Sequence, residues 1–373
     1  MSFKQKVFAL IAVLSGVFFV ACTTPEPTTV EVTRLVVETE TITEEVEVTR
    51  LVTEVEPANP GKLIIYSGRA ETLVQPIINQ FVEATGIEVE VRYGSTSEMA
   101  GLLLEEGENS PADIFFAQDP GGIGAVADAG LFTQLPEDIL LKVPARFASV
   151  EGTWVGISGR ARVVVYNTDE ISDPASQLPD DLMGFTDPQW DGRMGWAPAN
   201  GSFQAMVTGM RAVWGEEQTR AWLTGIQANN PVVYPNNTPI VEAVGNGEIT
   251  VGFVNHYYLY RFLAEQGEGF AARNYFLPSG GPGSLIMVSG AGILNTAQNR
   301  DNAVRFIEFL LSVPGQQYFA SQTFEYPLIE GVQTAALLPP LAELDALAIA
   351  IDLADLSDLA GTQAILTELG ILD

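Results

Sequence analysis

At 373 residues the chain is too long for a single small core, and its length suits two domains of ordinary size. Hydrophobic residues make up 47% and charged residues 17%, which is typical of a globular protein rather than a disordered one. Asp and Glu total 47 against 18 Lys and Arg, so the formal charge is −29 and the surface would repel nucleic acid phosphates. The single cysteine, Cys22, and the single histidine, His256, exclude disulfide scaffolds and zinc sites built from Cys and His. Any metal must therefore be held largely by oxygen.

The first residues have the pattern of a lipoprotein signal peptide. Lys4 and Lys6 precede an apolar run over residues 7–20, which is shorter than the roughly 20 residues that cross a bilayer. The run leads into Phe-Val-Ala-Cys, which resembles a lipobox with an atypical Phe. We therefore predict that residues 1–22 are a signal peptide and that a lipid on Cys22 anchors the mature protein outside the cytoplasmic membrane, on the periplasmic side or at the cell surface. The alternative is a transmembrane anchor that ends in a buried free cysteine.

An acidic segment rich in Thr, Val and Glu follows over residues 23–60. It contains the sequence Val-Glu-Val-Thr-Arg-Leu-Val twice, at 30–36 and 46–52. The segment is too short to form its own domain, and its composition favours a linker that holds the folded part away from the membrane. The alternative is a weak helical or strand pairing element between copies of the chain.

Beyond residue 61, short apolar runs alternate with amphipathic ones. The expected strands are 63–66, 87–93, 112–117, 163–166, 249–254 and 285–294, and the expected helices are 71–84, 97–106, 203–214, 238–244 and 301–312, with an acidic helical tail from about Leu341. Such alternation predicts an α/β fold of parallel sheets covered by helices. In folds of this kind the ligand site lies beyond the carboxyl ends of the strands.

Enzymatic chemistry finds little support in the sequence. A Ser-His-Asp mechanism would have to use His256, and no Gly-x-Ser-x-Gly turn is present to supply the nucleophile. The Gly-rich stretch at 121–124 lacks the spacing of a nucleotide-binding loop. We therefore expect a binding protein rather than an enzyme.

Two adjacent tyrosines, Tyr257 and Tyr258, stand where the expected strand 249–254 gives way to a helix. Two phenols at a helix N-terminus can point into one cleft, and a trivalent cation displaces the phenol proton because hard cations prefer oxygen donors. The pair is therefore a candidate metal site. The alternative is ordinary aromatic packing.

Three further features suit an anion. The helix that begins near Gly201 offers free backbone N–H groups, although these can serve simply as a helix cap. Arg160 and Arg162 stand immediately before a buried strand, and Arg69 follows the first strand, in a chain that has few cations. Arg69 has an alternative role, which is to pair with Glu71 or another surface acid.

Several stretches of the body resemble the ferric-ion-binding substrate-binding proteins of ABC importers. They are Ser110–Phe116, Ser158–Tyr166, Asn200–Phe203, Ala243–Tyr258, Pro282–Leu294 and Glu325–Leu328. The resemblance covers the chain from Gly61 onward in order. It implies the two-lobed periplasmic-binding-protein fold (type II-like), in which each lobe is a sheet flanked by helices and the ligand lies in the interlobe cleft.

The resemblance also implies a set of site residues. The metal ligands of the family fall on Tyr257 and Tyr258, and carbonate or phosphate would be the synergistic anion. The implied anion-binding residues are Arg69, Arg160, Asn200, Gly201, Ser202, Asn237 and Asn255. Three positions depart from the family pattern. Arg69 stands where many members have a His ligand, and Gln118, a candidate residue behind the ligands, stands where some have a Glu ligand. The third Tyr of other members would fall near residues 200–202, where this chain has none, so the resemblance supports two protein ligands.

The resemblance implies a function and a division of the chain. The expected function is capture of Fe(III) with a synergistic anion and delivery to the permease and ATPase subunits of an ABC importer, by a monomer. The alternative is a carrier of a small anionic or organic solute without metal. One lobe is expected over 61–160 and 288–335 and the other over 161–287 and 336–373, with crossings near Arg160 and Met287.

Overall fold

The computed structural model describes residues 60–347 and 351–372, so the predicted signal peptide, the lipidated Cys22 and nearly all of the repeat-bearing linker lie outside the described residues. The sheet has the strand order β2-β1-β3-β9-β4-β7-β5-β6, with β8 also paired to β4. The strands are β1 (Lys62–Ser67), β2 (Glu88–Tyr93), β3 (Ile114–Ala117), β4 (Trp154–Asn167), β5 (Met194–Trp196), β6 (Val232–Val233), β7 (Val251–Asn255), β8 (Ala272–Tyr275) and β9 (Ile286–Ile293).

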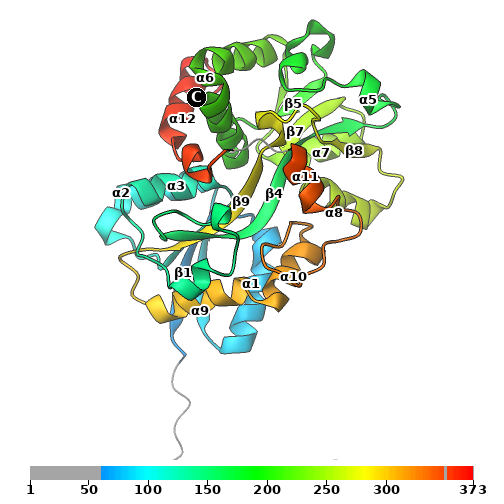
Figure 1. Cartoon of the computed structure of the whole chain (residues 1–373). Helices are drawn as coiled ribbons and strands as arrows, with labels where there is room; N and C mark the ends of the chain where they lie inside the picture. The colour runs from blue at the N-terminus through cyan, green and yellow to red at the C-terminus, as the bar shows by residue number, and fades with distance from the viewer. Residues whose placement is uncertain (1–59, 348–350, 373) are drawn as a thin grey trace, which may run out of the picture. The chain divides into compact units, whose positions relative to one another are not determined.

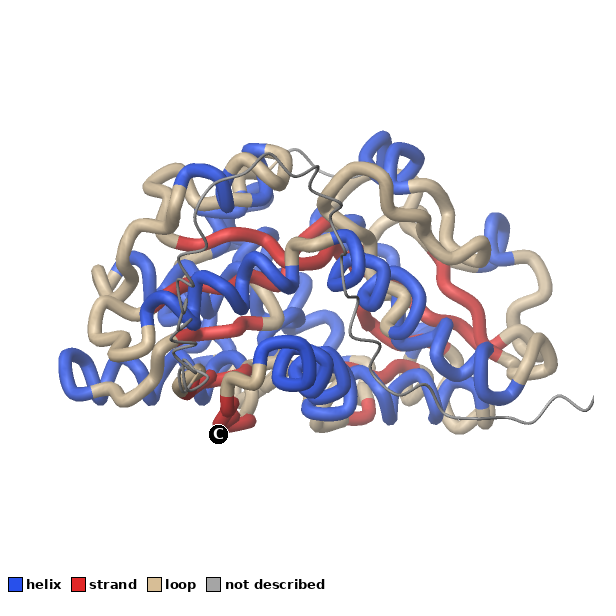
Figure 2. Tube along the Cα trace, turned by 90° about the horizontal axis from the view of Figure 1, so that it is seen from below, coloured by secondary structure: helices blue, strands red, loops and turns tan. Residues whose placement is uncertain are grey.

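Helices lie on both sides of these strands (Figures 1 and 2). They are α1 (Glu71–Thr85), α2 (Thr96–Glu106), α3 (Pro120–Asp128), α4 (Glu137–Leu140), α5 (Pro174–Gln177), α6 (Gly201–Ala228), α7 (Asn237–Gly245), α8 (Tyr257–Gln266), α9 (Arg300–Leu310), α10 (Val313–Gln322), α11 (Leu341–Leu347) and α12 (Leu359–Glu368). No helix in the described ranges is long and apolar enough to span a bilayer.

Strand β4 connects two lobes. Up to Ala161 it pairs with β9, and from Arg162 onward it pairs with β7. The first lobe is built on β1, β2, β3 and β9, and the second on β5, β6, β7 and β8. Arg160 and Met287, the expected crossing residues, are register partners on β4 and β9. The described residues thus adopt the expected two-lobed α/β fold.

Two details of the sequence-based prediction were wrong. The sheets are mixed rather than parallel, because β9 runs antiparallel to β3 and β4, and β4 runs antiparallel to β7. The expected strand 163–166 is only the end of β4, whose 14 residues are all buried. A fully buried strand shows no alternation of apolar and polar residues, and Arg160 and Arg162 disguise it further.

Local sequence explains where the helices of the first lobe begin and end. In α1 the buried residues Leu73, Val74, Ile77, Ile78 and Phe81 recur at helical spacing. The helix ends at Gly86, whose φ of 72° is accessible to glycine at little cost. Helix α2 begins with a capping box, in which Ser95 and Glu98 satisfy each other's backbone N–H groups.

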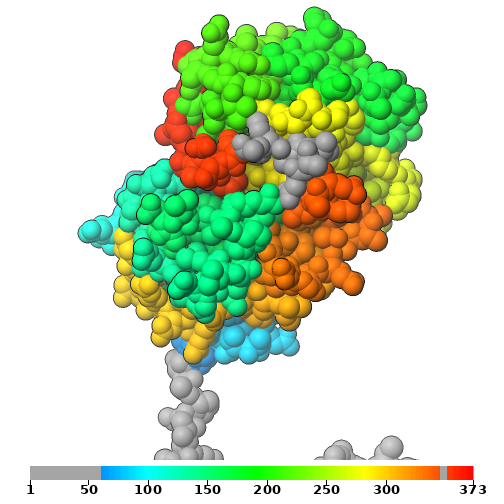
Figure 3. All heavy atoms as spheres, in the orientation of Figure 1, coloured from blue at the N-terminus to red at the C-terminus, as the bar shows by residue number. Residues whose placement is uncertain are grey.

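The C-terminal segment joins the two lobes from outside. The short 3-10 helix η6 (Leu353–Leu356) contacts both α3 of the first lobe and α6 of the second, and α12 packs along α6. In the space-filling view the red C-terminal residues lie between the green and the teal surfaces (Figure 3). This segment therefore restrains the relative position of the lobes.

Helix starts gather at the junction of the lobes. Helices α1, α2, α6, α7 and α8 each follow the carboxyl end of a strand, as the βα connections require. Their first turns line one cavity between the lobes. The fold therefore directs the positive ends of several helix dipoles to one place.

Candidate metal and anion site

Tyr257 and Tyr258 form the first turn of α8, directly after β7. Their rings are stacked with centroids 4.3 Å apart, and both side chains are buried. The Tyr257 hydroxyl is buried and has no hydrogen-bond partner among the described residues. Burial, followed by the neighbouring Tyr257, raises the pKa of Tyr258 well above its ordinary value. The Tyr258 phenol is therefore expected to be protonated until a cation replaces the proton.

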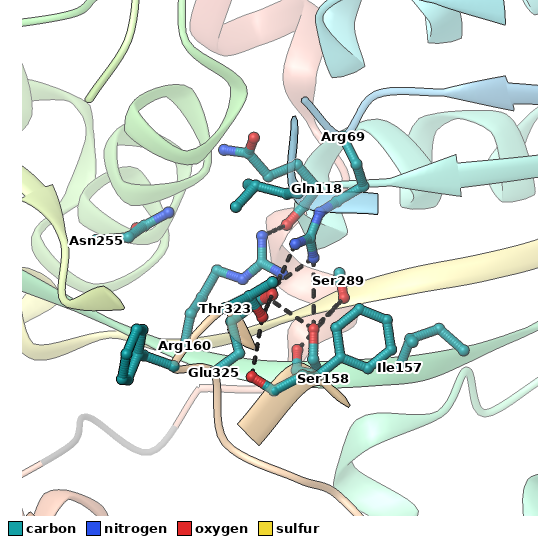
Figure 4. Close-up of polar contacts among 12 residues, drawn as sticks. Arg69, Gln118, Ile157, Ser158, Arg160, Asn255, Ser289, Thr323 and Glu325 are labelled. Atoms are coloured by element: carbon teal, nitrogen blue, oxygen red, sulfur yellow. Dashed lines mark hydrogen bonds and ion pairs between the residues drawn. The ribbon is translucent and has the colours of Figure 1, made fainter. Parts of the chain in front are cut away.

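Glu325 holds two of the arginines. Arg69 donates to both carboxylate oxygens of Glu325, at 3.0 and 2.7 Å, and Arg160 donates to one of them at 2.7 Å (Figure 4). The hydroxyls of Ser158 and Thr323 complete the set at 2.9 and 2.8 Å. Burial alone would raise the pKa of Glu325, but the two guanidiniums outweigh burial and lower the pKa to about 2. The carboxylate is therefore ionised at neutral pH and saturated with donors.

Arg69 is held by an ion pair inside the protein. Its partner is a buried carboxylate from the segment after α10, rather than Glu71 or another surface acid. Although burial would lower the pKa of Arg69, Glu325 raises it above its ordinary value. Arg160 also donates to the backbone carbonyl of Gln118, and its guanidinium carbon lies 5.6 Å from the centre of the Tyr257 ring. In both Arg69 and Arg160, the Nε group has no hydrogen-bond partner among the described residues.

Four of the residues expected to bind the anion, Asn200, Ser202, Asn237 and Asn255, form a hydrogen-bonded cluster on the second lobe. Asn200 caps α6 by accepting from the Ser202 N–H at 3.2 Å, and it also accepts from the Asn237 side chain at 3.2 Å. The Ser202 hydroxyl accepts from Asn255 at 3.1 Å and from Gln118 of the first lobe at 2.8 Å. Gln118 therefore supports Ser202 across the cleft.

Arg162 belongs to this cluster, although it is not among the anion-binding residues that the resemblance implies. Its guanidinium donates to Asn255 at 3.0 Å and to Asn237 at 3.4 Å. Its Nε and Nη2 groups are buried, and neither has a partner in the described parts of the chain. Burial lowers the pKa of Arg162 to about 9, so the group remains charged at neutral pH, and no carboxylate of the described residues lies beside it. A buried guanidinium in this state is a strong candidate for an anion contact.

The sequence contains a signal that places Arg162 beside Arg160. Side chains two residues apart on a strand point to the same side, so Ser158, Arg160 and Arg162 share one side of β4. Glu325 had no comparable signal, because it is 256 residues from Arg69 along the chain.

His256 has a structural role. Its Nδ1 accepts from the backbone N–H of Ala161 at 3.1 Å, so the other ring nitrogen donates to the Phe324 carbonyl at 3.0 Å. Burial lowers the pKa of His256 to about 4, and the ring stacks on Tyr326. The neutral imidazole therefore connects β4 to the segment that carries Glu325.

The described residues contain no cluster of three or more His, Cys, Asp or Glu side chains that could hold a metal ion.

The cleft between the lobes contains a cavity of about 480 Å³ beside these residues. Its lining from the first lobe is Gly68, Ala70, Thr72, Leu73, Gly94, Ser95, Thr96 and Gln118, and its lining from the second lobe is Ala199, Asn200, Gly201, Pro235, Asn236, Thr238, Pro239, Tyr258 and Arg261. Of the tyrosine pair, Tyr258 faces this cavity. Elsewhere the lobes are in direct contact, as in the hydrogen bond of 2.9 Å from Ser97 to Gln204.

Gly201 permits this close contact between the lobes. A Cβ atom at this position would overlap with Asp119 Oδ2 and lie 3.2 Å from the Thr96 Cβ. The change Gly201→Ala is therefore expected to hold the lobes apart, and small-angle scattering should give a larger radius of gyration than for the wild type. Gly209→Ala on the same helix is the control, because its added Cβ makes only ordinary contacts of 3.4 Å or more. Equal radii for the two variants would contradict this account.

The fold and the cleft define a two-lobed α/β binding protein of the periplasmic type. The chain belongs to the family of bacterial extracellular solute-binding proteins, which matches residues 76–348. It is 33% identical over 287 residues to the major ferric iron-binding protein of a serogroup A strain of Neisseria meningitidis, covering 76% of this chain and 86% of the relative. Solute binding as the family's role agrees with the expectation that the chain is not an enzyme.

Two further proteins are similar over most of their length. The chain is 33% identical to the Fe(3+)-binding periplasmic protein of Serratia marcescens, over 76% of this chain and 84% of the relative. The crystal structure of iron-bound HitA from Pseudomonas aeruginosa superimposes with a TM-score of 0.79 at 34% identity, covering 83% of this chain and 100% of HitA.

Proposed function

We propose that this protein captures Fe(III) together with a synergistic anion outside the cytoplasmic membrane and delivers it to the permease of an ABC importer. The observation that carries the proposal is the stacked, buried pair Tyr257 and Tyr258, in which one phenol oxygen has no hydrogen-bond partner among the described residues. The names of the relatives, which refer to ferric iron, support the same cargo.

The metal ligands in this proposal are the two phenolates. Fe(III) is a hard cation that favours anionic oxygen, and the described residues offer no carboxylate or imidazole cluster in place of the phenols. Arg69 cannot ligate a cation because a guanidinium has no lone pair to donate. Gln118 donates a hydrogen bond from its amide to Ser202, so in this proposal it positions an anion-binding residue and does not contact the metal. The two phenolates leave most of the metal's coordination positions for other oxygens.

A carbonate or phosphate ion supplies those oxygens. Fe(III) brings three positive charges and the phenolates bring two negative ones, so the loaded site needs a further negative charge. This need is greater because, within the part of the chain that the structure describes, Arg162 has no carboxylate beside it. The anion lies at the start of α6, against Asn200, Gly201 and Ser202, with Asn237 and Asn255 beside it. Arg69 and Arg160 contribute through their charge and their free Nε groups, and Arg162 contributes its Nη2.

The remaining features of the proposal concern delivery. The lobes, 61–160 with 288–335 and 161–287 with 336–373, close around the cargo about the crossings at β4 and β9. A monomer tethered through lipidated Cys22 and the acidic linker presents the closed lobes to the permease, and the ATPase subunits drive the import.

Iron binding is expected to depend on the anion. Removal of bicarbonate and phosphate should lower the Fe(III) affinity by roughly tenfold or more, because the uncompensated positive charge then opposes the metal. The measurement is an iron titration that follows the phenolate-to-iron charge-transfer absorption, with a chelator as competitor. A carrier of an anionic or organic solute without metal would show no such absorption.

Arg162→Gln is expected to reduce this anion dependence. The folded protein should not lose stability, because the guanidinium is buried without a counter-ion and its lowered pKa shows that burial disfavours the charge. Arg193→Gln, at a half-exposed ion pair with Glu170, is the control. An Arg162→Gln protein with the anion dependence of the wild type would remove Arg162 from the site.

A further inference from the structure

A single residue, His256, connects strand β7 to helix α8. Strand β7 ends at Asn255 and α8 begins at Tyr257. The two phenols proposed as metal ligands are the first two residues of α8, so their placement depends on how the connecting residue is held. His256 is fully buried, and the proposed function gives it no part in binding the cargo.

The side chain of His256 replaces a backbone acceptor of the sheet. Arg162 of β4 is the register partner of Asn255. Ala161, the preceding residue of β4, therefore lies opposite His256 in this antiparallel pair. The His256 N–H donates to the Ala161 carbonyl at 3.0 Å, but the Ala161 N–H donates to the ring Nδ1 at 3.1 Å, and the His256 carbonyl accepts from Asn274 at 2.8 Å. The ring thus lets the chain leave the sheet here while the buried Ala161 N–H keeps an acceptor.

The other ring nitrogen fixes the orientation of the imidazole. Nε2 donates to the Phe324 carbonyl at 3.0 Å, so Nδ1 keeps the lone pair that accepts from Ala161. Phe324 has a φ of 58°, in the left-handed region that residues with a side chain rarely adopt. Such a conformation persists where the surroundings impose it, and it is common at functional sites. The imidazole also stacks on Tyr326 with centroids 4.9 Å apart, so the ring is held from several sides.

The position of His256 is passed on to the tyrosine pair. Its ring meets the Tyr257 ring edge-on, with centroids 5.7 Å apart and an angle of 85° between the planes. Tyr257 stacks in turn on Tyr258. The Tyr257 hydroxyl has no hydrogen-bond partner among the described residues, so within them no polar contact of its own orients this phenol. Its direction is set by ring packing, to which His256 contributes, and by the start of α8.

We infer that His256 is a positioning residue for the metal ligands of this protein. By accepting from Ala161 it fixes where α8 begins, and this fixes the orientation in which the two phenolates meet the metal. The imidazole does not itself contact the metal, because both ring nitrogens are used inside the protein. This inference rests on the proposed function, and it adds a determinant of iron affinity behind the tyrosines. Replacing a residue that orients metal ligands from behind typically lowers the affinity by about 10- to 100-fold.

Two variants separate the roles of the two ring nitrogens. His256→Asn places an amide oxygen near the position of Nδ1, where it can accept from Ala161, whereas His256→Gln extends its amide toward Phe324 and leaves the Ala161 N–H without an acceptor. Fe(III) is titrated into the full-length protein in bicarbonate, with a chelator as competitor. His256→Gln should lower the affinity roughly tenfold or more and shift the maximum of the charge-transfer absorption. His256→Asn should stay within about threefold of the wild type, because it keeps the acceptor.

Tyr318→Phe controls for the loss of a buried hydrogen bond. The Tyr318 hydroxyl, on α10, donates to the Leu73 carbonyl at 2.8 Å, much as the His256 ring donates to the Phe324 carbonyl. This variant should lower the melting temperature and leave the iron affinity and the charge-transfer absorption unaltered. If His256 served stability alone, both of its variants would behave in the same way as Tyr318→Phe.

Asn274→Ala loosens the same connection from another side. It removes the hydrogen bond to the His256 carbonyl at a half-buried position, where a truncation is easily tolerated. The affinity should fall about threefold, with a shift of the absorption in the same direction as in His256→Gln. This variant decides the question if His256→Gln does not fold, since wild-type affinity and absorption in Asn274→Ala then overturn the inference.

Each outcome distinguishes the inference from the proposed function. A loss of affinity with altered absorption in His256→Gln that is largely restored in His256→Asn supports the positioning role. Equal affinities in these two variants, or a lower melting temperature with the affinity and absorption of the wild type, overturn it while iron binding by the tyrosines stands. Absence of charge-transfer absorption in the iron-treated wild type overturns the proposed function and the inference with it.

Discussion

Replacing Tyr257 or Tyr258 with Phe is expected to lower the Fe(III) affinity at least about 100-fold, since loss of even a residue that supports a metal ligand costs 10- to 100-fold. Phe keeps the ring, so the stacking at 4.3 Å and the buried packing are preserved. The Tyr257 hydroxyl has no hydrogen-bond partner among the described residues, so its removal breaks no hydrogen bond to these residues. Tyr257→Phe should therefore unfold at the temperature of the wild type or above it.

Competition with a chelator measures the affinity, and the charge-transfer absorption reports the phenolates directly. Tyr260→Phe is the matched control, because Tyr260 lies on the same helix and packs near Phe324 without belonging to the proposed ligands. A double Phe variant that retains the iron affinity of the wild type would refute the metal site. Loss of affinity in all three single variants would indicate a general disturbance of α8.

Glu325→Gln is expected to give the largest loss of stability. The carboxylate is fully buried between Arg69 and Arg160, and removing its charge leaves two buried guanidiniums with no counter-ion. Breaking a buried ion pair from one side costs about 3–5 kcal/mol. For a chain of this size the melting temperature should fall by about 10 °C at pH 7. Glu268→Gln, at an exposed pair with Arg273, should change the unfolding free energy by at most about 0.5 kcal/mol.

The dependence on pH identifies the charge as the cause. The pKa of Glu325 is about 2 in the folded protein, below the ordinary value of 4.5. A lowered carboxyl pKa means that the stabilisation is present in full above about pH 4.5 and is lost as the pH falls toward 2. The difference in melting temperature between wild type and Glu325→Gln should therefore shrink over this range. A difference that stays constant from pH 7 to pH 3 would assign the effect to packing.

Much of the fold could be predicted from local patterns. The apolar spacing over 71–84 and the buried run over 112–117 correctly indicated α1 and β3 of the first lobe. Antiparallel pairing of β4 and β9 could not be inferred in this way. Both strands are buried along their whole length, so no alternation shows their direction or their partners.

The candidate site, too, could be predicted only in part from the sequence. The tyrosine pair and the helix start at Asn200 are contiguous in sequence, and the rule that ligand sites lie at the carboxyl ends of strands placed them near one cleft. Their meeting with Arg162, Asn237 and Gln118 required the structure, because these side chains come from different strands and helices. The lipid anchor at Cys22 stays a prediction, since that residue lies outside the described part of the chain.

By itself the sequence determined the class of fold, the positions of the two adjacent phenols, and that any metal would have to be held largely by oxygen. These follow from composition and from spacing between near neighbours, which local physics controls. Only the tertiary structure decided that Arg69 and Arg160 share Glu325 as counter-ion while Arg162 has no carboxylate beside it among the described residues. The energy of a charge depends on its burial and on its partners in space, and the partner of Arg69 is 256 residues away along the chain.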